Sequence, residues 1–267
     1  MPPLRPIVFV DTETATLQGA PHLLELGAIR VEDGEVVDEF EELVLPRVEI
    51  DPEATDIHGI DDSMLRTASP APEVLARYTA WVGDDWMGAH NAAFDARVLG
   101  FEYARAGMEP PPGPFLDTLA LSKTHLGGAP DHKLETLCQY LDLEAGDHHR
   151  ALADAVWCWQ VFEACVEQAG GAEEVALTQW LGRSPMTIAS RTPGPPRLNA
   201  RLRGLERATR DEVEVTLLYG EGMAKPTPLP VHPRFLFERG GKGYLEGECG
   251  RTGLLKTYLL NKVRGVR

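Results

Sequence analysis

The chain has 267 residues, of which 43% are hydrophobic and 25% charged, a composition typical of a globular protein with one large domain or a medium and a small one. No stretch approaches the ~20 apolar residues of a membrane helix, and no charged segment precedes an apolar run as in a signal peptide, so we expect no membrane association. The four cysteines form no C-x-x-C pair and no disulfide framework pattern, which predicts buried thiols in a cytoplasmic protein.

The net charge of −15 by itself argues against nucleic-acid binding, but the charge is unevenly distributed. Residues 1–168 hold 10 basic and 31 acidic residues, a net charge of −21, whereas residues 169–267 hold 16 basic and 10 acidic residues, a net charge of +6. This asymmetry predicts two modules with different electrostatic tasks.

The first part of the chain has the pattern of an α/β domain with a mixed sheet. The unbroken apolar run at residues 7–10 is typical of a central strand that is buried on both faces. Residues 23–31 and 35–45 are extended runs separated by Asp33-Gly34, which indicates a hairpin. Further along, the pattern predicts a strand at residues 86–90 and helices at residues 71–83, 92–107 (capped by Asn91), 130–143 and 151–170.

The composition changes near residue 170. Residues 170–196 are rich in Pro, Ser, Thr and Arg, which indicates a linker after a first domain of residues 1–169. Residues 197–267 contain short extended runs separated by Gly, Pro or charged turns. This spacing predicts a second domain, a small antiparallel barrel or sandwich.

Acidic side chains interrupt three elements of the first domain that are otherwise apolar. Asp11 and Glu13 follow the first strand and point the same way, because side chains alternate along a strand. Asp95 stands early in one predicted helix, and Asp154 stands beside the apolar stripe of another. His149 precedes Asp154 by five residues, which on a regular helix would separate the two side chains by about 140°, so we expect this histidine on a loop before the helix.

These acids allow two interpretations. Asp11 and Glu13 either cap the following segment and are solvated, or a doubly positive ligand belongs between them. Four carboxylates and one histidine suit two divalent cations and a proton acceptor, since Mg²⁺ and Mn²⁺ prefer carboxylate and water oxygens. Two such ions about 3.5–4 Å apart can clamp the attacking and leaving oxygens of a phosphodiester displacement.

The same residues resemble three motifs of the DEDDh (DnaQ-like) 3′-5′ exonucleases, the family of the epsilon proofreading subunit of DNA polymerase III. D-x-E-T matches Asp11, Glu13 and Thr14; H-N-x-x-F-D matches His90, Asn91, Phe94 and Asp95; H-R-A-L-x-D-A matches residues 149–155. Residues 23–31 and 54–60 match two further family stretches that carry no catalytic carboxylate. The resemblance covers residues 5–168 and implies a ribonuclease H-like α/β fold, a mixed sheet flanked by helices.

The resemblance also implies the roles of the site residues. Asp11, Glu13 and Asp154 would hold one Mg²⁺ or Mn²⁺ ion, Asp11 would bridge to a second ion, and Asp95 would act largely through water. His149 would accept the proton of the attacking water as general base. The sister group has its tyrosine at the position of Arg150, which favours the histidine branch.

The implied substrate is single-stranded or 3′-ended nucleic acid, with DNA favoured, from which a nucleoside monophosphate would leave. The residues expected near the terminal nucleotide are Thr14, Leu17, His58 and Asn91. Two of them have structural alternatives, since His58 can cap a turn and Asn91 can cap the helix that follows it.

The C-terminal part, about residues 198–267, resembles the WYL domain, a small β-barrel of the Sm (SH3-like) type. Tyr244 and Leu245 match the second and third letters of its name, and Gly243 stands where the tryptophan belongs. The resemblance implies binding of ligands that include single-stranded nucleic acid, and the alternative is a barrel with an ordinary solvated surface. The basic residues expected to contact nucleic acid are Lys242, Arg251, Lys256, Lys262 and Arg264.

Together these observations predict a metal-dependent 3′-5′ exonuclease with a role such as DNA repair and a basic module that binds or senses nucleic acid. One alternative is an oligoribonuclease-like enzyme that acts on short RNA. Another is a WYL-type regulator whose nuclease half only binds nucleotide, against which the filled catalytic positions argue. The sequence leaves protein partners open.

Overall fold

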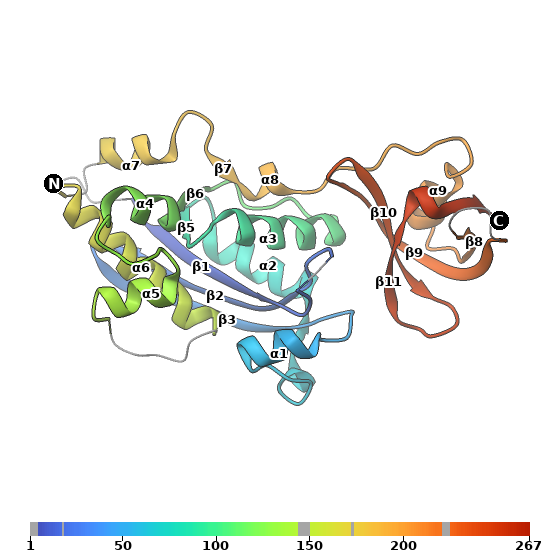
Figure 1. Ribbon diagram of the computed structural model, residues 1–267, viewed down its shortest axis with the longest axis horizontal. Coiled ribbons are helices and arrows are strands. Elements are labelled where there is room, and N and C mark those ends of the chain that lie inside the picture. The colour runs from blue at the N-terminus through green and yellow to red at the C-terminus, as the bar shows by residue number, and fades with distance from the viewer. Residues whose placement is uncertain (1–4, 18, 144–149, 172–173, 221–224) are drawn as a thin grey trace. The chain divides into compact units, whose positions relative to one another are not determined.

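The computed structural model describes residues 5–17, 19–143, 150–171, 174–220 and 225–267 (Figure 1). The chain divides into two compact units, Met1–Thr192 and Pro193–Arg267, each with its own sheet and its own core. Among the described helices, none combines the length and the apolar character that a membrane crossing requires.

The first unit is built on a seven-stranded mixed sheet with the order β4-β3-β2-β1-β5-β6-β7. Its strands are β1 (Ile7–Thr14), β2 (Leu23–Glu32), β3 (Glu35–Leu45), β4 (Ser69–Pro70), β5 (Trp86–Ala89), β6 (Pro114–Asp117) and β7 (Met186–Thr187). The long strands β1, β2 and β3 are antiparallel, and β5 and β6 continue the sheet parallel to β1.

The predicted hairpin between β2 and β3 is confirmed. Asp33 and Gly34 form its turn with φ angles of 50° and 81°. Positive φ at both central positions twists the turn in the same sense as the strands that it joins, and glycine adopts this conformation without steric cost.

Helices cover both faces of this sheet (Figure 1). The helices of this unit within the described residues are α1 (Pro52–His58), η1 (Met64–Thr67), α2 (Ala71–Val82), α3 (Ala93–Ala106), α4 (Thr118–His125), α5 (Leu134–Tyr140), α6 (Ala151–Gln168), α7 (Glu174–Leu181) and α8 (Ile188–Arg191). Val8 and Val10 of β1 pack in one core with α2 and α3, whereas Ile7 and Phe9 pack in a second core with α6. The apolar run therefore fills both faces of a central strand, as predicted.

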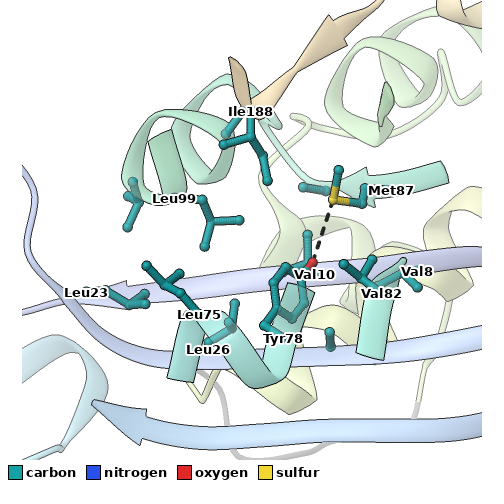
Figure 2. Close-up of a cluster of buried hydrophobic side chains, with 14 of the residues drawn as sticks. Val8, Val10, Leu23, Leu26, Leu75, Tyr78, Val82, Met87, Leu99 and Ile188 are labelled. Carbon is teal, nitrogen blue, oxygen red and sulfur yellow. Dashed lines mark hydrogen bonds between the residues drawn. The ribbon is translucent and has the colours of Figure 1, made fainter. Parts of the chain in front are cut away.

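Figure 2 shows the core on the side of α2 and α3. The hydroxyl of Tyr78 on α2 donates to the sulfur of Met87 on β5 at 3.6 Å, so a fully buried hydroxyl has a partner inside an apolar cluster. Ile188 of α8 belongs to the same core (Figure 2).

Part of the segment predicted as a linker is structured. β7 pairs with β6, and Ile188 is completely buried in the core of the first unit. The Pro- and Arg-rich composition of residues 170–196 conceals these elements, because β7 and α8 are too short to produce a periodic pattern.

The second unit contains a five-stranded antiparallel sheet with the order β11-β10-β9-β8-β12. Its elements are α9 (Gly204–Arg210), β8 (Val215–Tyr219), β9 (Thr227–Arg239), β10 (Lys242–Cys249), β11 (Leu255–Leu259), η2 (Leu260–Lys262) and β12 (Val263–Val266). Leu205 of α9 packs with Leu217, Leu245 and Tyr258 in its core. The second sheet is present as predicted, and closure into a barrel stays a prediction.

Candidate active site

Carboxylates from two distant segments of the first unit meet where β1 ends. Asp11 and Glu13 share the face of β1 that α6 covers, because alternate residues of a strand point the same way. Asp154 lies in the first turn of α6. One carboxylate oxygen of each of these three residues lies within 4.8 Å of those of the other two, so the predicted ligands of the first metal are close together.

A glycine on β2 permits this approach of α6 to the sheet. Gly27 stands opposite Asp11 in the antiparallel register of β1 and β2. A Cβ atom at Gly27 would lie 2.2 Å from the backbone nitrogen of Leu152 and 2.3 Å from the carbonyl carbon of Ala151. Any larger residue would displace the start of α6, so the absence of a side chain at this position sets how closely Asp154 approaches β1.

Asp95 approaches the same cluster from α3. Its carboxylate is buried and accepts a 2.8 Å hydrogen bond from the hydroxyl of Thr12, the residue after Asp11 on β1. Asp95 is not part of the group of three within 4.8 Å, but its charge acts on Asp11. This arrangement is compatible with the predicted role of Asp95 through water.

Burial and mutual repulsion raise the pKa values of these acids. Burial is the largest cause at Asp11, whose pKa lies well above its ordinary value, and the neighbouring charges of Asp95 and Asp154 add to it. Burial, followed by the charge of Asp154, raises the pKa of Glu13 to about 8, and burial raises that of Asp95 to about 7. A bound cation would relieve this repulsion, and the all-oxygen donor set fits Mg²⁺ or Mn²⁺.

Glu25 of β2 connects the sheet to the start of α6. Its carboxylate is fully buried and accepts the backbone N–H of Ala151 at 2.9 Å. The guanidinium of Arg150 donates to the same carboxylate from Nε at 3.0 and 3.2 Å and from Nη2 at 2.6 Å. The predicted general base, His149, precedes Arg150 and lies outside the described residues.

Two of the predicted substrate residues lie at the end of β1 and in the loop that follows it. Thr14 is buried, and its hydroxyl donates to the carbonyl of Thr16 at 3.2 Å. Leu17 is 47% exposed, and its backbone N–H donates to the carboxylate of Asp51 at 3.0 Å. The loop therefore presents an apolar side chain to solvent while its backbone is held by the segment that precedes α1.

The other two predicted substrate residues have clear local contacts. His58 ends α1 and is buried, and its Nδ1 accepts the backbone N–H of Ile60 at 3.0 Å, which is the turn-capping contact expected as its alternative role. Asn91 is exposed with φ 66°, and its backbone N–H donates to Asp117 at 3.2 Å. The predicted capping of α3 by Asn91 is wrong, because α3 begins after Ala92 without a side-chain cap.

The five basic residues predicted to bind nucleic acid in the second unit do not gather on one face of its sheet. Lys242 begins β10, whereas Lys256 of β11 pairs with Gly247 of β10. Lys256 shares a face of the sheet with its partner Gly247. Gly247 stands five positions after Lys242 on β10, and side chains alternate along a strand, so Lys242 and Lys256 belong to opposite faces. The other three, Arg251, Lys262 and Arg264, lie in the turn after β10, in η2 and on β12.

Another group of basic residues was not singled out from the sequence. Arg197, Arg201, Arg203, Arg207 and Arg210 are all exposed, and we call them the arginine surface. Leu205 and Ala208 turn the opposite side of α9 into the core. Arg207 forms an ion pair with Asp211 at 3.2 Å, and the other four have no ion pair within the part of the chain that the structure describes. Arg203, Arg207 and Arg210 recur at intervals of four and three residues, which is the sequence signal that marks this surface.

The first unit is similar in sequence to the exonuclease family and to segments of DNA polymerases. A sequence model of the exonuclease family matches residues 8–162. The chain is 35% identical over 166 residues to a PolC-type DNA polymerase III of Oceanobacillus iheyensis and 35% identical over 149 residues to that of Bacillus subtilis. These matches cover 60% and 55% of this chain but 12% and 10% of the polymerases, so the chain spans about a tenth of the length of these relatives.

Solved structures share the fold of the first unit. Exonuclease X, solved in complex with 5′ overhanging duplex DNA, is 28% identical and has a TM-score of 0.51, covering 63% of this chain and 95% of its own. A 3′-exonuclease solved in recognition of the histone mRNA stem-loop has a TM-score of 0.55 at 14% identity, over 62% of this chain and 83% of its own, a likeness of fold alone. These neighbours confirm the predicted α/β fold with a mixed sheet flanked by helices. Since the family model covers more than half of the sequence, the chain belongs to the exonuclease family, whose members are phosphodiester hydrolases.

Proposed function

We propose that the chain is a metal-dependent 3′-5′ exonuclease that releases nucleoside 5′-monophosphates from the 3′ ends of nucleic acid, with DNA favoured. The observation that carries this proposal is the meeting of Asp11, Glu13 and Asp154 within 4.8 Å, in a chain of the exonuclease family. DNA is favoured because the relatives at 35% identity are DNA polymerases and Exonuclease X was solved with DNA.

The residues of the first unit have separate tasks in this reaction. Asp11, Glu13 and Asp154 would hold one divalent cation, Asp11 would also contact a second, and Asp95 would act through water. Bound cations supply positive charge where the attacking and leaving oxygens become negative. His149 would accept the proton of the attacking water, whose oxygen bonds to phosphorus as the bond from phosphorus to the 3′ oxygen breaks.

The loop after β1 and the end of α1 would hold the terminal nucleotide. Leu17 offers exposed apolar surface from a backbone fixed by Asp51, an arrangement suited to contact with a base. Thr14, His58 and Asn91 would contact the sugar or phosphate. In this proposal His58 retains its hydrogen bond from Ile60.

The second unit would act as a WYL-like module that binds or senses nucleic acid. The first 168 residues carry a net charge of −21, and phosphate contacts normally require Lys and Arg. The arginine surface supplies exposed positive charge in addition to Lys242, Arg251, Lys256, Lys262 and Arg264. The exonuclease domain would extend beyond the predicted boundary at residue 169 through α8, because Ile188 completes its core.

A digestion assay tests the proposed activity. Single-stranded DNA, duplex DNA and RNA are labelled at the 5′ end and incubated with Mg²⁺, Mn²⁺ or EDTA, and Asp11→Asn serves as the inactive control. A ladder that shortens from the 3′ end only when metal is present supports the proposal. Cleavage confined to short RNA would favour the oligoribonuclease-like alternative, and metal-dependent nucleotide binding without cleavage would favour the regulator.

A further inference from the structure

We propose that Glu25 is a positioning residue that holds the carboxylate of Asp154 against β1 and thereby sets the affinity of the site for divalent metal. This inference rests on the proposed function, because it concerns the same carboxylates. Glu25 itself is outside the group of three acids whose oxygens lie within 4.8 Å in the described part of the chain. Its task would be to place a ligand rather than to be one.

Within the described residues, the hydrogen bonds to the Glu25 carboxylate come from the start of α6. Glu25 is paired with Glu13 in the register of β1 and β2, so two carboxylates stand side by side in the sheet. Glu13 contributes to the group of acids, whereas both oxygens of Glu25 accept hydrogen bonds from Arg150 and one also accepts from Ala151. Glu25 places another negative charge beside the cluster, and its hydrogen bonds with Arg150 offset that charge.

By holding Arg150 and Ala151, Glu25 also holds Asp154, which lies in the same first turn of α6. The backbone N–H of Asp154 donates to the carbonyl of Arg150 at 3.0 Å, the first hydrogen bond of the helix. Glu25 therefore holds the residue on which the first turn of α6 is built, while Gly27 lets the same turn contact the sheet.

The register of β1 and β2 places each predicted metal ligand of β1 beside one residue of β2. Asp11 stands opposite Gly27 and Glu13 stands opposite Glu25, so each predicted ligand on β1 faces a residue of β2 that contacts the start of α6. Residues that orient metal ligands in this way typically change metal affinity or activity by about 10–100-fold when they are altered.

The first unit contains a matched control for this proposal. Glu102 of α3 is also a buried glutamate that accepts one backbone N–H, from Leu23 at 3.0 Å, and one guanidinium, from Arg105 at 2.7 Å. It resembles Glu25 in its chemistry, but these hydrogen bonds join it to β2 and α3 rather than to the start of α6. If Glu25 only stabilised the fold, replacing either glutamate would have the same kind of effect.

The experiment compares Glu25→Gln with Glu102→Gln in the full chain. Mn²⁺ binding to each folded, substrate-free protein is titrated at one pH, and thermal unfolding is followed by circular dichroism in EDTA. We expect Glu25→Gln to weaken Mn²⁺ binding by about 10–100-fold, and cleavage to recover as Mn²⁺ is raised. Glu102→Gln should lower the unfolding temperature and leave Mn²⁺ affinity unchanged.

Equal Mn²⁺ affinity in wild type and in Glu25→Gln would overturn the proposal. Should Glu25→Gln fail to fold, Arg150→Lys takes its place, because lysine keeps the charge and loses the fork that binds both carboxylate oxygens. Weakened Mn²⁺ binding in a protein that cleaves no substrate would reject the proposed function and retain the role of Glu25.

Discussion

The hydroxyl of Thr12 donates a 2.8 Å hydrogen bond to the buried carboxylate of Asp95, and this contact joins the strand that bears Asp11 to the helix that bears the fourth acid. The bond favours the charged form of Asp95 and opposes the effect of burial on its pKa. Thr12 is therefore a residue of the site that none of the sequence motifs marks as functional.

Replacing Thr12 by Val is expected to lower kcat by roughly 10-fold, the equivalent of one lost hydrogen bond of about 1.4 kcal/mol. Loss of the bond raises the pKa of Asp95 above about 7, so the acid side of the pH–rate profile should move to higher pH. Steady-state cleavage from pH 5.5 to 9 measures both effects, and Thr12→Ser, which keeps the hydroxyl, should resemble wild type. An unchanged profile in Thr12→Val would show that Asp95 is oriented by other contacts.

Asp11→Asn is expected to abolish cleavage while the fold survives, because Asp11 is the acid assigned to both cations. Cleavage of 5′-labelled DNA and circular dichroism are the measurements. Glu32→Gln, at an exposed position at the end of β2, is the control and should behave as wild type. A folded Asp11→Asn protein that cleaves at the wild-type rate would exclude the two-metal assignment.

The metal-free protein is expected to lose stability as the pH rises from about 4.5 to about 8. In this window Glu13 binds a proton in the folded state, where burial and Asp154 raise its pKa to about 8, but not in the unfolded state, where its pKa is near 4.5. The free energy of unfolding falls with rising pH wherever the folded state binds more protons. Unfolding temperatures in EDTA should therefore decrease across this range, and less so in Glu13→Gln.

Metal should reverse this trend, since Mn²⁺ and protons compete for the same carboxylates. The increase in unfolding temperature on adding Mn²⁺ should be larger at pH 8 than at pH 6. An increase independent of pH would show that the cation binds elsewhere.

His149→Ala is expected to slow cleavage by roughly 10²–10⁴-fold, the usual effect of removing a general base. Mn²⁺ affinity should persist because the carboxylates remain. Single-turnover cleavage and Mn²⁺ titration separate the two effects, and His148→Ala is the control. If His148→Ala were the damaging change, the third motif would be displaced by one residue.

Neutralising the arginine surface is expected to weaken binding of single-stranded DNA and to flatten its salt dependence. Each lost phosphate contact reduces the slope of log affinity against log salt by about 0.7, so Arg201→Gln, Arg203→Gln and Arg210→Gln together should reduce it by about 2. Binding is measured in the Asp11→Asn background across a salt series. A second variant, in which Lys242, Lys256 and Lys262 are replaced by Gln, is measured in the same way for comparison.

The result decides between the two groups of basic residues. If only the lysine variant binds DNA more weakly and with a flatter salt dependence, the binding surface is formed by the basic residues expected from the sequence. Unchanged slopes in both would show that the second unit does not bind nucleic acid.

Much of the first unit was predictable because its signals are local. The apolar run of β1, the Asp33-Gly34 turn and the acids at the ends of elements are each readable within a few residues. The residues that stand opposite those acids were not predictable. Asp11 pairs with Gly27 and Glu13 pairs with Glu25. These pairs depend on the register between strands, which spacing along the chain does not reveal.

Short and proline-containing strands were missed for a different reason. β6 has four residues and begins with Pro114, and β7 has two residues. β9 contains Pro228, Pro230 and Pro233, which interrupt the apolar pattern in the first part of this strand. In these cases tertiary pairing, rather than local propensity, makes the strand.

The burial of Ile188 has a consequence for handling the first unit as an isolated protein. A chain cut at residue 169 would lack β7, so β6 would become an edge strand with unpaired backbone groups. It would also expose the apolar surface of α3 that α8 covers. An open edge beside an uncovered apolar patch promotes self-association. Solubility of the isolated first unit is thus expected to depend on a proline- and arginine-rich segment in which no catalytic residue is predicted.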